Sequence, residues 1–86
     1  MARPRPNRVR ERRAIFGDAV RDRRIAEGLT QEALAERAGI DRKSISRIEN
    51  GAFSPSLDRI WLIADALRVS VTDLIGATGT VEPPER

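Results

Sequence analysis

The amino-acid sequence predicts an all-α protein, a compact bundle of five short helices. Five segments place apolar residues three and four positions apart, and four of them follow a residue that commonly caps helices. No segment alternates apolar and polar residues as a half-buried strand would. With 86 residues, the chain has the length of a single domain.

Composition excludes several classes of function. The chain has no cysteine and no histidine, which excludes disulfides, thiolate metal sites and the commonest general base. We therefore expect no metal, no cofactor and no enzymatic activity. The longest apolar run, 60–64, is too short to span a bilayer, and the basic N-terminus lacks the apolar region of a signal peptide. We expect a cytoplasmic protein that does not bind membranes.

The first helix is clearest from about Arg13 to Glu27, where Phe16 and Val20 share one face. A start at Arg8, with the preceding asparagine as its cap, is the alternative. Residues 1–12 are expected to form a basic arm, either partly disordered or extending this helix. Residues 13–76 would form the domain, and residues 77–86 would form a polar tail.

The other four helices are expected at residues 31–38, 42–50, 57–67 and 71–75. Each follows a side chain that can accept a hydrogen bond from a free N–H group of the first turn. These capping residues are Thr30, Asp41, Ser56 and Ser70. Gly39 and Gly51 follow the second and third helices, where a left-handed residue ends many helices.

Positive charge is concentrated at the N-terminus. Residues 1–13 hold six arginines and one acid, a balance of +5, whereas residues 14–86 hold ten basic and twelve acidic residues, a balance of −2. Such a cationic end suits a polyanion, and basic arms of this kind enter the minor groove of DNA. A solvated tail is the alternative. The six arginines are Arg3, Arg5, Arg8, Arg10, Arg12 and Arg13.

The segment 30–51 predicts two helices joined by a tight turn. Ala35 is small enough for a close helix crossing, Gly39 can adopt a positive φ, and Ile40 would insert into the core. On the third helix, Ile45 and Ile48 share the buried face. The opposite face carries side chains suited to base edges and phosphates, namely Lys43, Ser46, Arg47 and Asn50, with Arg42 and Ser44 beside them.

The start of the third helix is unusual in its charge. The second, fourth and fifth helices each have an acid in the first turn, which is favourable beside the positive end of the helix dipole. The third helix has Arg42 and Lys43 there, each costing about 0.3–1 kcal/mol at low salt. Contact with phosphates or guanine edges would account for these cations.

These residues resemble the phage-repressor type of helix-turn-helix, the xenobiotic-response-element family of regulators. The matching segments are residues 28–40, 44–51, 63–70 and 73–76, together with Arg21, Arg24 and Pro55. The resemblance implies a lambda-repressor-like DNA-binding domain of five helices. It also implies a homodimer on a palindromic operator in double-stranded DNA.

The resemblance also implies individual roles. Gln31 and Asn50 would contact phosphates, and Arg24 would form a structural ion pair with Glu49. The residues that would enter the major groove are Arg42, Lys43, Ser44 and Arg47. Asp41 stands where the family often has serine or threonine, so it would either pair with a basic neighbour or discriminate among bases.

The fourth helix predicts a surface for self-association. Trp61 and Leu62 lie beside or outside its core-facing stripe, and exposed tryptophan and leucine often mark interfaces. They would be joined by Val71, Leu74 or Ile75. The alternative is that Trp61 completes the core of a small domain.

The sequence thus favours a sequence-specific transcriptional regulator that excludes or recruits RNA polymerase. A controller of restriction–modification genes, a phage-like repressor and an autoregulating antitoxin all fit this description. The alternative function is an antitoxin or other protein-interaction module that masks a partner protein. RNA binding by the arginine-rich end has less support, because that end contains no aromatic residue for base stacking.

Overall fold

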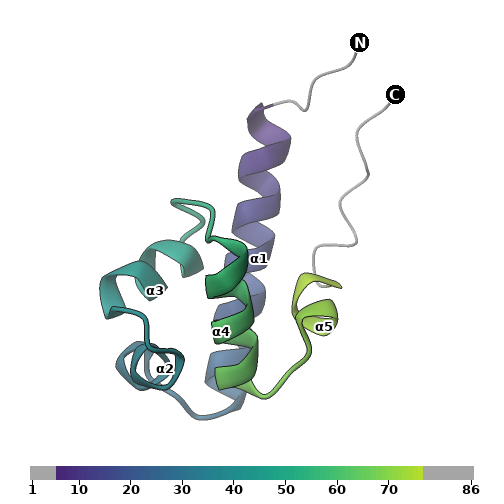
Figure 1. The fold of residues 1–86 in the computed structure, drawn as a ribbon. Coiled ribbons are helices and arrows are strands. Elements are labelled where there is room, and N and C mark those ends of the chain that lie inside the picture. The colour runs from purple at the N-terminus through teal and green to yellow at the C-terminus, as the bar shows by residue number, and fades with distance from the viewer. Residues whose placement is uncertain (1–5, 77–86) are drawn as a thin grey trace.

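The computed structural model describes residues 6–76, and the side chains from residue 8 onward. It contains five helices and, within those residues, no strand, which confirms the predicted all-α bundle (Figure 1). The helices are α1 (Pro6–Ala26), α2 (Gln31–Ala38), α3 (Arg42–Glu49), α4 (Leu57–Leu67) and α5 (Val71–Gly76). The predicted tail, residues 77–86, lies outside the described residues.

The first helix begins earlier than either predicted start. α1 runs without interruption from Pro6, so the described part of the basic arm is helical and extends α1. Proline is compatible with a first turn because its fixed φ suits the helix and it has no N–H group to leave unpaired. The arginines that follow are good helix formers. The third helix ends at Glu49, with Asn50 as its C-cap, and α5 extends to Gly76.

The predicted capping residues begin the other four helices. Thr30 and Asp41 accept N–H bonds from Ala33 (3.0 Å) and Ser44 (2.9 Å). Ser56 accepts from the N–H of Arg59 at 3.2 Å. The hydroxyl of Ser70 accepts from the N–H of the residue three positions later at 2.9 Å. These bonds explain why the four helices begin where the sequence predicts.

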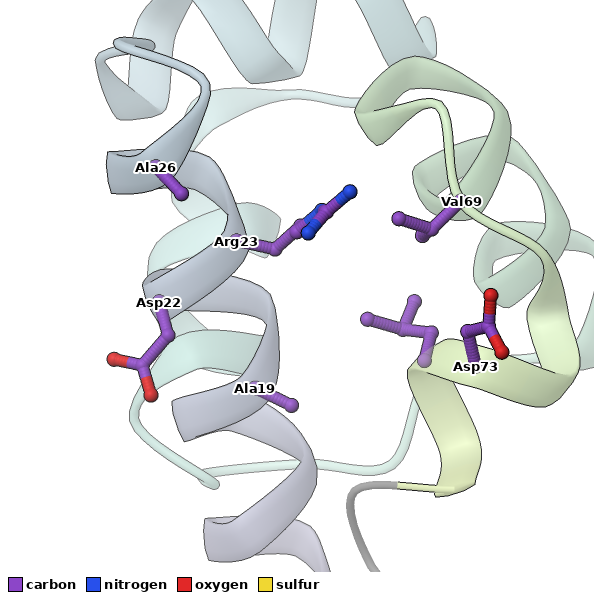
Figure 2. Close-up of a pocket in the computed structure, with 7 residues that line it drawn as sticks. Ala19, Asp22, Arg23, Ala26, Val69 and Asp73 are labelled. Atoms are coloured by element: carbon purple, nitrogen blue, oxygen red, sulfur yellow. The ribbon is translucent and has the colours of Figure 1, made fainter.

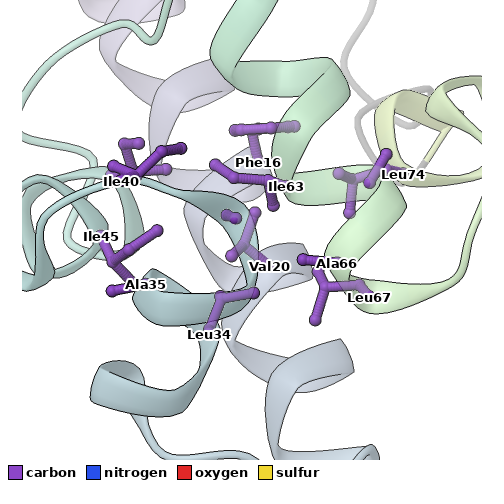
Figure 3. Close-up of a cluster of buried hydrophobic side chains, with 13 residues drawn as sticks. Phe16, Val20, Leu34, Ala35, Ile40, Ile45, Ile63, Ala66, Leu67 and Leu74 are labelled. Carbon is purple, nitrogen blue, oxygen red and sulfur yellow. The ribbon is translucent and has the colours of Figure 1, made fainter.

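The core lies where α1 and α4 meet the helix-turn-helix. In Figure 1, α2 and α3 lie on one side of α1 and α4, and α5 lies on the other. Fully buried side chains from four helices fill the centre. Figure 3 shows Val20, Leu34, Ile45, Ile63 and Leu67 among them, and Ile48 is buried to the same degree. Leu74 adds the fifth helix to this cluster.

The turn between α2 and α3 has the predicted geometry. Ala35 is buried, Gly39 has φ 70° in the left-handed region, and Ile40 is buried in the core cluster. The N–H of Ile40 donates to the carbonyl of Ala35 at 3.0 Å, which closes the turn. The turn thereby fixes α3 with Ile45 and Ile48 facing inward.

A glycine that the sequence analysis did not single out allows α1 to cross the end of α3. A Cβ on Gly17 would lie 2.6 Å from the Glu49 carbonyl oxygen and still closer to that of Ile48. Both neighbours are backbone atoms, so the clash cannot be relieved by the movement of a side chain. The close approach of α1 to the last turn of α3 therefore requires glycine at position 17.

Gly17→Ala should destabilise the fold, although glycine-to-alanine changes inside helices usually stabilise by up to about 1 kcal/mol. Overpacking should reverse that sign and lower the free energy of unfolding by about 1–3 kcal/mol or more. Urea denaturation followed by circular dichroism measures the change. Gly76→Ala is the control, because a Cβ there meets nothing within 4 Å. Equal midpoints for the two variants would contradict the close approach.

Candidate nucleic-acid interface

A buried carboxylate lies at the end of α3. Glu49 is 1% exposed and, among the described residues, it is the one charged side chain in the core. Arg24 of α1 pairs with it through two bonds, from Nε to Oε2 at 2.7 Å and from Nη2 to Oε1 at 3.0 Å. The Nη1 atom of Arg24 also donates to the carbonyl of Leu29 at 2.8 Å. These hydrogen bonds to Glu49 raise the pKa of Arg24 against the opposing effect of desolvation.

The Glu49 carboxylate also binds the amide of Gln31, and Arg21 beside it binds the amide of Asn50. Gln31 at the start of α2 donates from Nε2 to Oε1 of Glu49 at 3.1 Å. Arg21 donates from Nη2 to the Glu49 carbonyl and to Oδ1 of Asn50, both at 3.4 Å. Because an amide nitrogen carries two hydrogens, Gln31 keeps one donor for a phosphate. Asn50 uses its oxygen on Arg21, so its NH₂ group can still donate.

The outer side of α3 carries the exposed cations. Arg42, Lys43, Arg47 and Asn50 are exposed, and Ser46 is half-buried between them and the core. On the inner side, Ile45 and Ile48 are buried. Together with Gln31, these polar residues form what we call the recognition surface: Gln31, Arg42, Lys43, Ser46, Arg47 and Asn50.

Ser44 is arranged differently from this row. It is half-buried, and its hydroxyl donates to Oδ1 of Asp41 at 2.7 Å while its N–H donates to Oδ2 at 2.9 Å. Arg59 of α4 donates from Nη1 to the Ser44 hydroxyl at 3.5 Å. The Ser44 hydrogen is therefore already used in the cap, which is a different environment from the groove contact that the resemblance implies.

The cap also explains how Asp41 can lie beside the cations at the start of α3. The two hydrogen bonds from Ser44, followed by the nearby positive charge of Arg59, hold the pKa of Asp41 below its usual value. The carboxylate is thus paired with the α3 N-terminus and lies in the field of a basic neighbour. Arg59 was not a sequence-predicted site residue, since its place beside α3 depends on how α4 packs.

The loop between α3 and α4 supplies an aromatic partner for α3. The guanidinium carbon of Arg47 lies 5.6 Å from the centroid of the Phe53 ring, a cation–π distance. Sequence reasoning did not select Phe53. It could have been selected because it is one of only three aromatic residues in the chain and directly follows the third helix in a loop.

A different surface lies between α1 and α5. A concavity there is lined by the charged residues Asp22, Arg23 and Asp73, and by Ala19, Ala26, Val69 and Leu74 (Figure 2). Two carboxylates at its rim would repel phosphates, so this side is unsuited to DNA. The charges thus favour the side formed by α2 and α3.

The remaining predicted site residues lie on α1, α4 and α5. Arg8, Arg10, Arg12 and Arg13 lie in the first part of α1, whereas Arg3 and Arg5 lie outside the described residues. Trp61 is 52% exposed, and Leu62 and Ile75 are also exposed. Val71 is half-buried. Leu74 is only 4% exposed and packs in the core, so it is not available to a surface patch on the isolated chain.

Residues 6–76 contain neither a membrane-spanning helix nor a cluster of metal ligands. No helix in that range is both long enough and apolar enough to cross a membrane. No group of three or more acidic residues in that range is gathered as metal ligands would be.

Comparison with known proteins gives matches across most of the chain. Residues 20–74 match the helix-turn-helix family model. An HTH-type transcriptional regulator of Mycobacterium tuberculosis is 38% identical over 69 residues, covering 80% of this chain and 49% of that protein. Antitoxin PezA of Streptococcus pneumoniae is 35% identical over 71 residues, covering 83% and 45%. The chain thus spans about half the length of these two relatives.

A solved structure has the same fold. The crystal structure of the restriction-modification controller protein C.AhdI from Aeromonas hydrophila superposes with a TM-score of 0.71 and 37% sequence identity. The superposition covers 72% of this chain and 94% of that one.

Glu49→Gln should strongly destabilise the protein. The change leaves the Arg24 charge without a counterion in a site where that side chain is 13% exposed, at a cost of about 3–5 kcal/mol. Asp18→Asn is the matched control, because the exposed Asp18–Arg21 pair (3.7 Å) should contribute under about 1 kcal/mol. Chemical denaturation measures both. Similar losses in the free energy of unfolding for the two variants would show that the buried ion pair stabilises the fold no more than the exposed one.

Proposed function

The chain belongs to the helix-turn-helix family of transcriptional regulators, and we propose that it binds a palindromic operator as a homodimer, with α3 in the major groove. The family is a class of DNA-binding proteins rather than of enzymes, as the sequence predicted. The observation that carries the proposal is the exposed row of cations on α3, opposite a fully buried face.

Charge at the start of α3 supports the choice of this helix. Arg42 and Lys43 lie near the positive end of the helix dipole, where they are unfavourable in the free protein. DNA removes this penalty by bringing phosphates and guanine acceptors to the same place. Arg47 lies one turn further along the same exposed side and would donate to a base edge, while Ser46 lies between them.

Two amides support the expected orientation on the DNA backbone. Gln31 of α2 donates to the Glu49 carboxylate, and Asn50, the C-cap of α3, accepts from Arg21. Each has a free N–H donor for a phosphate oxygen. The first turn of α2 also offers free backbone N–H groups, which favour anions. Phosphate contacts of this kind set the register, while Arg42, Lys43 and Arg47 distinguish bases.

An exposed apolar strip on α4 supports the homodimer. Leu57, Trp61 and Leu62 are all exposed on this helix, and Ile75 is exposed on α5. Large apolar side chains clustered on a surface mark interfaces more often than chance. A two-fold dimer formed through this strip would present two copies of α3 to half-sites about 34 Å apart. Val71 would lie at its edge.

The proposed biological role is control of transcription. A DNA-bound dimer in the cytoplasm would either exclude or recruit RNA polymerase, as a controller protein or a phage-like repressor does. The similarity to an antitoxin favours a second candidate, in which the chain also masks a partner protein. Co-purification of a stoichiometric partner from the native source would support that candidate, and its absence would argue against it.

The arginines at the start of α1 are proposed to add contacts that do not depend on sequence. Arg8 and Arg10 lie on the first turns of α1, which extend beyond the other helices in Figure 1. In the described residues the arm is a helix, so it would approach phosphates as a charged rod instead of inserting as an extended strand. Arg3, Arg5, Arg12 and Arg13 would strengthen the same local field.

Arg47→Ala should weaken binding to the selected duplex, which is the sequence that the parent protein enriches from a random DNA library. Loss of a base contact costs about 1–3 kcal/mol, or roughly a 5- to 160-fold rise in Kd. Helicity should not change. Arg23→Ala, in the concavity between α1 and α5, is the control and should bind as the parent does. Equal affinity of parent and Arg47→Ala would refute the role of α3.

Trp61→Ser should dissociate the dimer. Loss of a central aromatic side chain costs about 2 kcal/mol or more, which is roughly a 30-fold weaker association. Sedimentation equilibrium measures the change. Ile25→Ser is the control, because Ile25 is an exposed apolar residue of α1 outside the strip. A parent protein that stays monomeric on its operator, or equal effects of the two changes, would argue against this interface.

Replacing Arg8 and Arg10 together by alanine should reduce the salt dependence of DNA binding. Each lost phosphate contact lowers the slope of log Kd against log salt by about 0.9. The loss in affinity should be similar for the selected duplex and for unrelated DNA. Anisotropy titrations over a range of salt concentrations test this, with Arg23→Ala as the control. An unchanged slope would mean that these arginines remain in solvent.

A further inference from the structure

Phe53 lies in the loop that joins α3 to α4, outside the recognition surface defined above. Its ring is half-buried and packs against the core cluster. Its other notable contact is with Arg47, whose guanidinium carbon lies 5.6 Å from the ring centroid. The ring thus connects the core of the domain with an exposed cation of the recognition surface.

The two residues before Phe53 are hydrogen-bonded to the end of α3, and one of them lies against α1. The N–H of Ala52 donates to the Arg47 carbonyl at 2.8 Å, and that of Gly51 donates to the Ile48 carbonyl at 3.0 Å. Gly51 has φ 68° and lies so close to α1 that a Cβ would be 3.0 Å from the Cα of Ala14. The position of the ring relative to Arg47 is therefore set by backbone contacts as well as by packing.

A cation–π contact restricts a guanidinium without using its donors. The aromatic face attracts the cation, while the five N–H groups stay available for hydrogen bonds. A bidentate contact to guanine O6 and N7 needs one edge of the guanidinium, held in the correct orientation. An arginine without such a contact on the exposed side of a helix would instead lose rotamer freedom when it binds.

We propose that Phe53 is a positioning residue that orients Arg47 for base recognition and so contributes to sequence specificity. This inference rests on the proposed function, because it assigns Phe53 a role in the same DNA complex. Phe53 itself does not contact DNA in this scheme. Its effect passes through Arg47, so removing the ring should affect the selected duplex and leave unrelated DNA nearly unaffected, since that binding depends on phosphate contacts.

The expected effect is modest and measurable. A cation–π contact at an exposed site corresponds to about a 2- to 5-fold change in an equilibrium constant. Phe53→Leu should therefore raise Kd for the selected duplex by about 2- to 5-fold. Phe53→Tyr and Phe53→Trp keep a ring and should bind within about 2-fold of the parent.

A double-variant cycle separates positioning from a general structural role. Phe53→Leu in an Arg47→Ala background should add little further loss, because the ring has no guanidinium to orient. In an Arg42→Ala background the same change should again raise Kd by about 2- to 5-fold, because Arg42 lies at the other end of α3. Melting temperatures of all variants are measured beside the titrations. If Phe53→Leu unfolds, Phe53→Met replaces it as an apolar residue without a ring.

The outcomes distinguish this inference from the function on which it rests. A parent protein that enriches no sequence would overturn the proposed function, and the role of Phe53 with it. A parent that enriches a sequence, with Phe53→Leu losing affinity equally in the Arg42→Ala and Arg47→Ala backgrounds, would overturn the positioning role alone. Failure of Phe53→Tyr to retain affinity would also overturn it.

Discussion

The buried carboxylate of Glu49 is the constraint on which the helix-turn-helix depends. A charge in this position would cost several kcal/mol without a partner, and Arg24 supplies that partner through two short hydrogen bonds. The carboxylate accepts a third bond from Gln31 on α2. One side chain at the end of α3 therefore fixes α1, α2 and α3 with respect to one another.

The arrangement has a direct consequence for the proposed contact with DNA. Because the core side of α3 is fixed by Glu49, Ile45 and Ile48, its other side faces solvent with a row of cations. Gly17 permits the close approach of α1 that this requires. The loop after α3 then adds Phe53 beside Arg47. The residues that stabilise the fold and the cations proposed to contact DNA thus lie on opposite sides of the same short helix.

Much of the fold is predictable from local signals in the sequence. The caps at Thr30 and Ser56 determine where α2 and α4 begin, and a left-handed glycine at position 39 ends α2. The start of α1 was not predictable, because a run of arginines is compatible with both a helix and a disordered arm, and proline is permitted in a first turn. Local patterns therefore predict a helix end that is marked by a capping residue better than they predict the start of a helix within a run of arginines.

The candidate site was predictable where it depends on helical periodicity. The exposed cations of α3 follow from spacing, whereas Phe53 and Arg59 depend on how a loop and another helix pack against α3. The capping role of Asp41 was predictable, but the half-buried position of Ser44 between that cap and Arg59 was not. Leu74 faces the core because α5 packs on α1 and α4, a contact that its own short helix does not encode.

Nuclear magnetic resonance of the isotope-labelled protein, titrated with the selected duplex, tests the central claim most directly. The account predicts that the largest amide shifts fall at Gln31 and at residues 42–50, with small shifts at Asp22, Arg23 and Asp73. It also predicts intermolecular contacts between the Arg47 side chain and base protons of the major groove. Shifts centred on the concavity between α1 and α5, with residues 42–50 unchanged, would contradict the assignment of α3 as the recognition helix.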